Sequence, residues 1–202
     1  MAMDKKEKCI AILDSCQYTV QGITLLCGKI PGWHIAGVAK SYYDLLRLVE
    51  RKPIDMVICG IGNHSDDFSR LLNLSRYPTR GRILLMDKSS AVLSKTFLAA
   101  GFDAVVSKQV ALNELITIIA RILFSEKDAV AEYGDEHCYL PQEREVLSAL
   151  LKGERPCDIA RTMGISYRTV SRYKLSGLRR AGLNSLNEIL ASKKHYAIGN
   201  AL

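Results

Sequence analysis

Three arginines near the C-terminus recur at a spacing that places them on one side of a helix. At about 100° per residue, Arg172 and Arg179 fall within about 60° of Arg168, and Ser171 and Leu175 share that face. Guanidinium groups bind guanine through two contacts or neutralise phosphates. These residue types at this spacing therefore predict a surface that enters the major groove of DNA.

The opposite side of the same helix is apolar or small, as a side that packs on a domain core must be. Val170, Tyr173, Gly177 and Ala181 fall there. We expect Thr169, close to the helix start, to donate its hydroxyl to a phosphate, as backbone amides there also can. A basic face that is merely solvated is the alternative, and the glycine-containing turn before the helix favours DNA.

A second place where chemistry is expected is the end of an apolar run, IDMVICGIG at residues 54–62. The run is typical of a buried parallel strand, and functional groups of α/β folds lie at such strand ends. Yet Cys59, Gly60 and Ile61 carry no carboxylate, hydroxyl or imidazole. Since no nucleophile–base pair, phosphate loop or metal-ligand spacing occurs elsewhere, we expect neither an enzyme nor a bound metal or cofactor.

Charge is distributed unevenly along the 202 residues, whose net charge is +7. From Tyr139 onward there are 11 Lys and Arg against 5 Asp and Glu, whereas the preceding part has 17 against 16. Such a local basic surplus favours nucleic acid as the partner. Six cysteines without a CxxC pair predict no disulfide framework or zinc site. The sequence shows no signal peptide and no run near the ~20 apolar residues of a membrane span, so we expect a cytoplasmic protein without a membrane partner.

Short apolar runs alternate with amphipathic segments in the first part of the chain. Five strands are predicted over residues 9–13, 33–39, 55–59, 82–86 and 104–107, with five helices near 19–29, 42–51, 68–76, 91–100 and 112–124. Strict alternation of this kind implies right-handed crossovers and a doubly wound, parallel five-stranded sheet. We therefore predict an α/β domain over residues 1–124.

Residues 125–138 are acidic and lose this periodicity, as a linker does. Residues 139–202 form a second domain with helices alone, predicted over 141–152, 156–163 and from Ser166 to about 181, with a fourth from 184 or 185. Pro141 and Pro156 suit first helical positions, and Gly164 suits a left-handed cap. ARTMGISYRTVSRY at residues 160–173 is thus two helices joined by a tight turn, a helix-turn-helix.

The segment LPQEREVLSALLKGERPCDIARTMGISYRTVSRYKLSGLRRAGL, residues 140–183, combines an acid-rich first helix with the patterns G-x-x-x-x-x-I-A and I-S-x-x-T-V. In these motifs it resembles the DNA-binding domain of the NarL/FixJ (LuxR-type) response regulators, and the linker and the tail NSLNEIL look closest to the RcsB and BglJ branch. The resemblance implies a four-helix domain that binds DNA as a dimer. By the family's pattern, Ser171, Arg172 and Leu175 contact DNA; Ser171 stands where the family usually has lysine, which predicts a shifted target sequence. The motif residues are Glu143, Glu145, Gly153, Ile159, Ala160, Ile165, Ser166, Thr169, Val170, Gly182 and Leu183.

The first 124 residues resemble a phosphoacceptor receiver domain whose reactive positions have changed. Asp14 keeps one of the two acids that bind Mg²⁺ in that family, and Ser15 replaces the other. The phosphoacceptor aspartate falls on Gly60 and a Thr/Ser position falls on Met86, while the lysine is kept as Lys108. Glycine has no carboxylate on which an acyl phosphate can form, and Asp14 alone is a poor cage for Mg²⁺. We expect a degenerate receiver without phosphorylation, in which Lys108 pairs with Asp14.

Three functions follow as hypotheses. The first is an atypical response regulator that binds promoter DNA independently of aspartyl phosphorylation and uses the receiver-like domain to form a homodimer or to bind a related regulator. The second is an auxiliary subunit that heterodimerises with a phosphorylatable, RcsB-like regulator. The third is a ligand- or redox-sensing regulator that uses the vacated receiver pocket, or Cys16 and Cys59.

Overall fold

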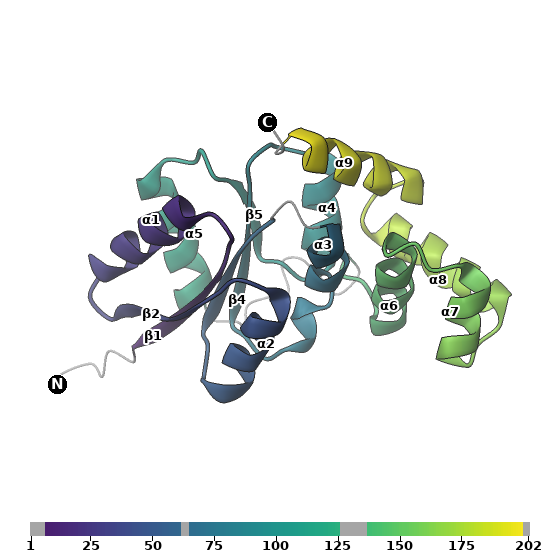
Figure 1. Cartoon of the computed structure of the whole chain (residues 1–202), viewed down its shortest axis with the longest axis horizontal. Helices are drawn as coiled ribbons and strands as arrows, with labels where there is room; N and C mark the ends of the chain where they lie inside the picture. Colours follow the sequence, from purple (N-terminus) through teal and green to yellow (C-terminus); the bar gives the residue numbers. More distant parts are fainter. Residues whose placement is uncertain (1–6, 62–64, 126–136, 200–202) are drawn as a thin grey trace. The chain divides into compact units, whose positions relative to one another are not determined.

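A five-stranded parallel sheet forms the first part of the protein (Figure 1). The computed structural model describes residues 7–61, 65–125 and 137–199. The sheet has the order β2-β1-β3-β4-β5, which is the flavodoxin-like doubly wound order. The predicted fold class is therefore confirmed. Its strands are β1 (Lys8–Leu13), β2 (Trp33–Ala39), β3 (Met56–Gly60), β4 (Gly81–Met86) and β5 (Ala104–Ser107).

Helices alternate with these strands and then continue alone. Most begin and end within two residues of their predicted bounds, but the single helix predicted over residues 68–76 is wrong. The chain there leaves the α-helix after Leu71, because Asn73 donates its N–H to Arg70 and Arg76 donates to Asn73, each three residues back. The helices are α1 (Gln17–Gly28), α2 (Tyr42–Arg51), α3 (Ser65–Leu71), the 3₁₀ turn η1 (Leu74–Arg76), α4 (Ala91–Ala99), α5 (Leu112–Phe124), α6 (Pro141–Leu151), α7 (Pro156–Met163), α8 (Tyr167–Arg180) and α9 (Leu186–Gly199).

Contacts between residues divide the chain into two compact units. The first unit contains residues 1–62, 77–87 and 103–126, and so holds the whole sheet with α1, α2 and α5. The second contains residues 63–76, 88–102 and 127–202, and so joins α3, η1 and α4 to the helices α6 to α9. Most of the predicted linker lies outside the described residues, and domain limits at 124 and 139 remain a prediction.

Helices cover both faces of the sheet in the first unit. α1 and α5 lie on one side and α2 on the other (Figure 1). A bulge in the pairing of β1 with β2, after Ile10, turns Gly37 toward α2, where a Cβ would lie 2.8 Å from a methyl of Leu48. The absent side chain lets α2 approach the sheet closely. The core on the α1 and α5 side includes Ile12, Leu26, Met56, Ile58, Ile83, Leu85, Ile119 and Leu123.

The second unit has two apolar clusters. The rings of Phe68 and Phe97 meet edge to face at 4.9 Å and thereby join α3 to α4. Hydrogen bonds link these helices to the C-terminal part, because the Ser148 hydroxyl donates to the carbonyl of Ser69 at 2.7 Å. The cluster under α8 consists of Val146, Leu150, Ile159, Ala160 and Val170.

Among the described residues, no helix is long and apolar enough to cross a bilayer.

A buried carboxylate joins α6 to α8. Glu143 is 1% exposed, and it accepts the backbone N–H of Leu140 at 2.9 Å, which satisfies one amide at the start of α6. The Ser176 hydroxyl and the guanidinium of Arg180, 2.9 Å away, come from α8. Because a buried charge is costly unless it is paired, the angle between the two helices must keep all these donors in place.

We expect the substitution Glu143→Ala to lower the free energy of unfolding by about 3 kcal/mol, since it leaves Arg180 and two other donors without their acceptor. The measurement is equilibrium denaturation in urea. Glu145→Ala is the matched control on the same helix, because Glu145 and its partner Arg76 are about half exposed, at 52% and 48%, and such pairs contribute less than about 1 kcal/mol. Equal losses in the two variants would show that Glu143 does not organise the domain.

Candidate nucleic-acid interface

A tight turn between α7 and α8 fixes the direction in which α8 leaves the domain. Gly164 ends α7 in the left-handed conformation, with φ of 64°, which glycine adopts without steric cost. Ser166 then caps α8 and accepts the backbone N–H of Thr169 at 3.1 Å. The predicted glycine cap is confirmed, and the helix begins next to Ser166, as predicted.

The two faces of α8 separate as the sequence predicts. Val170, Gly177 and Ala181 are buried, and Tyr173 packs on the core cluster under the helix. Glycine is needed at position 177 because α8 approaches α6 closely there. A Cβ on Gly177 would lie 2.9 Å from a methyl of Leu147 on α6. The exposed side chains of the other face are Arg168, Arg172, Leu175 and Arg179.

The arginines of α8 serve two different purposes. Arg180 binds Glu143 in the interior, so its charge is already compensated. In contrast, Arg168, Arg172 and Arg179 have no ion pair with any carboxylate of the described residues. The guanidinium of Arg172 lies 5.5 Å from the ring centre of its neighbour Tyr173. The exposed face therefore keeps uncompensated positive charge for an external anion.

Two smaller residues near the predicted contact surface are only partly exposed. The Thr169 hydroxyl lies 2.9 Å from that of Ser166, and either of the two hydroxyls can be the donor. Ser171 is half-buried beside Arg172. Their predicted contacts with DNA remain predictions.

The other predicted site lies at the carboxyl ends of the strands, in the first unit. Asp14 follows β1 and Lys108 follows β5, and the expected pair is present: the ammonium lies 3.0 Å from Asp14 Oδ2 and 3.3 Å from Asp87 Oδ1. Burial alone would lower the pKa of Lys108, but the hydrogen bond and charge of Asp14, with the charge of Asp87, hold it above its ordinary value. The other Asp14 oxygen accepts the N–H of Cys16 at 2.8 Å.

Gly60, at the end of β3, leaves room for this ion pair. A Cβ built on Gly60 would overlap the carboxylate of Asp14. Any side chain at position 60 therefore requires the Asp14 carboxylate to shift. The space in which a carboxylate of residue 60 would lie is taken by the carboxylate of residue 14.

The remaining predicted pocket residues do not complete a cation site. Ser15 is exposed and Met86 is buried. Asp14 Oδ1 accepts the Cys16 N–H and Oδ2 lies 3.0 Å from the Lys108 ammonium, so the residues present do not fit a divalent cation, which needs several free oxygen ligands. Among the described residues, no three His, Cys, Asp or Glu side chains gather in a way that could hold a metal. Asp87 was not predicted to lie at this site, although an acid directly after an apolar strand was the available signal.

The two thiols proposed as redox groups have different surroundings. Burial raises the pKa of Cys59, which is fully buried, and a thiol of this kind is inert. Hydrogen bonds from the side chain and backbone of Thr19 lower the pKa of Cys16, at the start of α1. Of the two, Cys16 alone has an accessible, activated thiol.

The described elements thus combine a parallel sheet of order 2-1-3-4-5 with helices that contain a helix-turn-helix. Residues 141–191 match the family model described as bacterial regulatory proteins, luxR family. This match covers α6 to α8 and part of α9, the segment that carries the exposed arginine face.

Two known proteins are similar to nearly the whole chain at low sequence identity. The Fimbriae Z protein of Salmonella typhimurium is 24% identical over 208 residues, which cover 96% of this chain and 99% of that protein. The probable transcriptional regulatory protein SgaR of Hyphomicrobium methylovorum is 26% identical over 198 residues, 94% of this chain and 92% of that protein. Among solved structures, RcsB from Salmonella enterica serovar Typhimurium, bound to promoter rprA in the presence of phosphomimetic BeF₃⁻, has a TM-score of 0.51 and 20% identity over 90% of this chain and 98% of its own. That likeness shows the fold.

We expect Gly60→Ala to lower the free energy of unfolding by about 1–3 kcal/mol, because its methyl group displaces the Asp14 carboxylate from Lys108. Gly22→Ala is the matched control: nothing lies within 4 Å of a Cβ there, so it should stabilise α1 by about 0.5–1 kcal/mol. Urea denaturation measures both. In an Asp14→Ala background the cost of Gly60→Ala should shrink, and strict additivity of the two substitutions would contradict the overlap.

Proposed function

We propose that the protein is a transcription regulator that binds promoter DNA through α8 and acts independently of aspartyl phosphorylation. The observation that carries the proposal is the exposed face of Arg168, Arg172 and Arg179, which lacks compensating carboxylates among the described residues, in a segment that matches the luxR family. DNA-binding relatives of this architecture add support. We place its action in the cytoplasm, where promoter DNA is found.

The dimensions of α8 support insertion into the major groove. Arg168 and Arg179 are 11 positions apart, which is about 16 Å along a helix, and the groove is about 12 Å wide. An α8 laid in the groove thus reaches bases with its central residues and phosphates with those at its ends. The first unit contributes little net charge, so the basic C-terminal part supplies the electrostatic attraction.

Independence from phosphorylation rests on the filled pocket. By the resemblance to receiver domains, the carboxylate that accepts phosphate stands at the end of the third strand, where Gly60 has no side chain. Lys108 already pairs with Asp14 and Asp87. The same arrangement argues against a ligand in this pocket. If the protein senses redox state, Cys16 is the one of the two proposed thiols that stays a candidate.

We further infer that the receiver-like part binds a protein partner. Large apolar side chains project from α1 and α5: Tyr18 is 86% exposed and Leu25 68%, while Leu112 is 61% and Phe124 62% exposed. Both helices pack on the same side of the sheet, so these side chains suit an interface with a second copy or a related regulator. The auxiliary-subunit alternative, with an RcsB-like regulator as partner, uses the same surface.

We expect Arg168→Ala and Arg172→Ala each to weaken promoter binding by about 1–3 kcal/mol, because each removes a guanidinium that faces DNA. Target fragments come from genome-wide mapping of bound DNA with identification of the co-bound proteins, and fluorescence anisotropy then gives the affinities. Arg51→Ala, an exposed arginine at the end of α2, is the control and should change affinity little.

Unchanged affinity in both α8 variants would mean that another surface reads DNA. If the purified chain binds its targets only after a related regulator is added, the auxiliary-subunit function holds instead of the homodimer.

Treatment with acetyl phosphate should neither label the protein at an aspartate nor change its affinity for DNA. Hydroxylamine-sensitive radiolabel and anisotropy are the two measurements. A response regulator that keeps an aspartate at the end of the third strand serves as the positive control. Labelling accompanied by tighter DNA binding would overturn phosphate independence.

A further inference from the structure

Two large apolar side chains of α8 are exposed, and the fold accounts for them differently. Tyr167, the first residue of the helix, is 58% exposed and has a hydroxyl that water can hydrogen-bond. Leu175 is 48% exposed, and its side chain has no polar atom. It is neither a member of the apolar cluster under α8 nor one of the residues packed against that cluster. The core beneath the helix therefore does not explain why a leucine stands at position 175.

Leu175 lies in the middle of the exposed arginine face. At about 100° per residue, it points within about 20° of Arg168. Its neighbours on the helix surface are Arg172, three residues before it, and Arg179, four residues after it. Tyr167, in contrast, points about 100° away from Arg168, at the edge of this face. Of the two exposed apolar side chains, Leu175 is the one surrounded by arginines.

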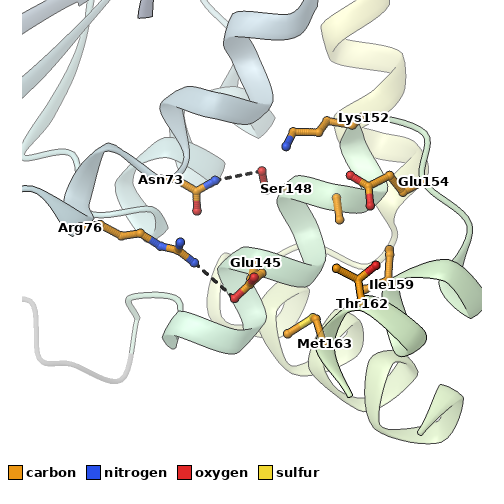
Figure 2. A pocket seen from close by; sticks show the side chains of 10 residues that line it. Asn73, Arg76, Glu145, Ser148, Lys152, Glu154, Ile159, Thr162 and Met163 are labelled. Carbon is orange, nitrogen blue, oxygen red and sulfur yellow. Dashed lines mark hydrogen bonds and ion pairs between the residues drawn. The ribbon is translucent and has the colours of Figure 1, made fainter. Parts of the chain in front are cut away.

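The surrounding charges restrict what can cover Leu175. Arg76, on η1 in the same unit, has a half-exposed guanidinium that pairs with Glu145 at 3.3 Å (Figure 2). The three arginines around Leu175 have no such pair with a carboxylate of the described residues. An apolar protein surface placed over Leu175 would take these guanidinium groups out of water without compensation, which is costly. A suitable partner therefore carries negative charges around a small apolar group.

The major groove of double-stranded DNA has this combination of groups. Phosphates lie along both of its edges, and thymine presents its 5-methyl group inside the groove, beside the hydrogen-bonding edges of the bases. RNA is a poorer match, because the major groove of an RNA helix is too deep and narrow for side chains to read. A leucine between arginines therefore matches thymine in DNA.

We propose that Leu175 is a specificity-determining residue that contacts the 5-methyl group of a thymine in the target DNA. The inference rests on the proposed binding of α8 to promoter DNA, and it adds which base the centre of the helix selects. Leu175 lies about 4.5 Å further along the helix axis than Arg172. Because successive base pairs are about 3.4 Å apart, the thymine lies within about two base pairs of the position that Arg172 contacts.

The test removes the methyl groups of the target DNA one at a time. In fragments obtained by mapping of bound DNA, each thymine of the binding site is replaced singly by deoxyuridine, which keeps every hydrogen-bonding group and lacks only the methyl. Fluorescence anisotropy with the full chain measures the affinity. At one thymine or more, the replacement should weaken binding about three- to tenfold, as expected for the loss of one buried methyl contact.

Variants of the protein assign this effect to one side chain. Leu175→Ala should bind the unmodified fragment more weakly and should no longer respond to deoxyuridine at the critical position. Leu175→Met keeps an apolar side chain of similar volume and should still respond. Leu98→Ala is the matched control, because Leu98 of α4 has a similar exposure of 43% and lies outside α8. It should respond like the unchanged protein.

Equal binding of every deoxyuridine fragment, or a full response of Leu175→Ala at the critical position, would overturn the assignment of Leu175. Specific binding that ignores all methyl groups removes this inference alone and leaves the proposed function in place. If the chain binds no mapped fragment more tightly than unrelated DNA, the proposed function fails and this inference fails with it.

Discussion

The carboxylate of Glu143 is the constraint on which the DNA-binding part depends. A charge that is 1% exposed must be matched by donors, and here they come from the start of α6 and from two positions on α8. Meeting this requirement fixes how α8 rotates about its own axis. Arg180 turns inward, and the three arginines on the other side turn outward. The exposed charge that we assign to DNA is thus a consequence of the buried charge that holds the helix.

In the first unit, too, a buried carboxylate is matched by neighbouring groups, and here the pairing compensates the charge of Lys108. The positions of Asp14 and Lys108 are reactive in receiver domains, whereas here the two side chains pair with each other. With glycine at position 60, the Asp14 carboxylate lies in the space beside β3, where Oδ2 is near the Lys108 ammonium and Oδ1 accepts the Cys16 amide. The pocket thereby becomes part of the packing of this unit.

Much of the fold could be predicted from the sequence because its signals are local. Alternation of apolar runs gave the strands, Gly164 and Ser166 marked the turn before α8, and the spacing of Arg168, Arg172 and Arg179 defined one helical face. The break after Leu71 was missed, because the apolar pattern continues through the 3₁₀ turn and hides the change in hydrogen bonding. Asp87 was missed because its partner is distant in sequence.

The sequence by itself determined which residues could do chemistry: guanidinium groups on one face of a helix, and no carboxylate at position 60. Only the tertiary structure decided which charges are already used. Arg180 and Arg179 are neighbours of identical chemistry, yet one is paired inside and the other is exposed. The Ser148 hydroxyl and the carbonyl of Ser69 likewise meet from segments far apart in the chain. Pairing depends on three-dimensional proximity, and residue type and spacing do not encode it locally.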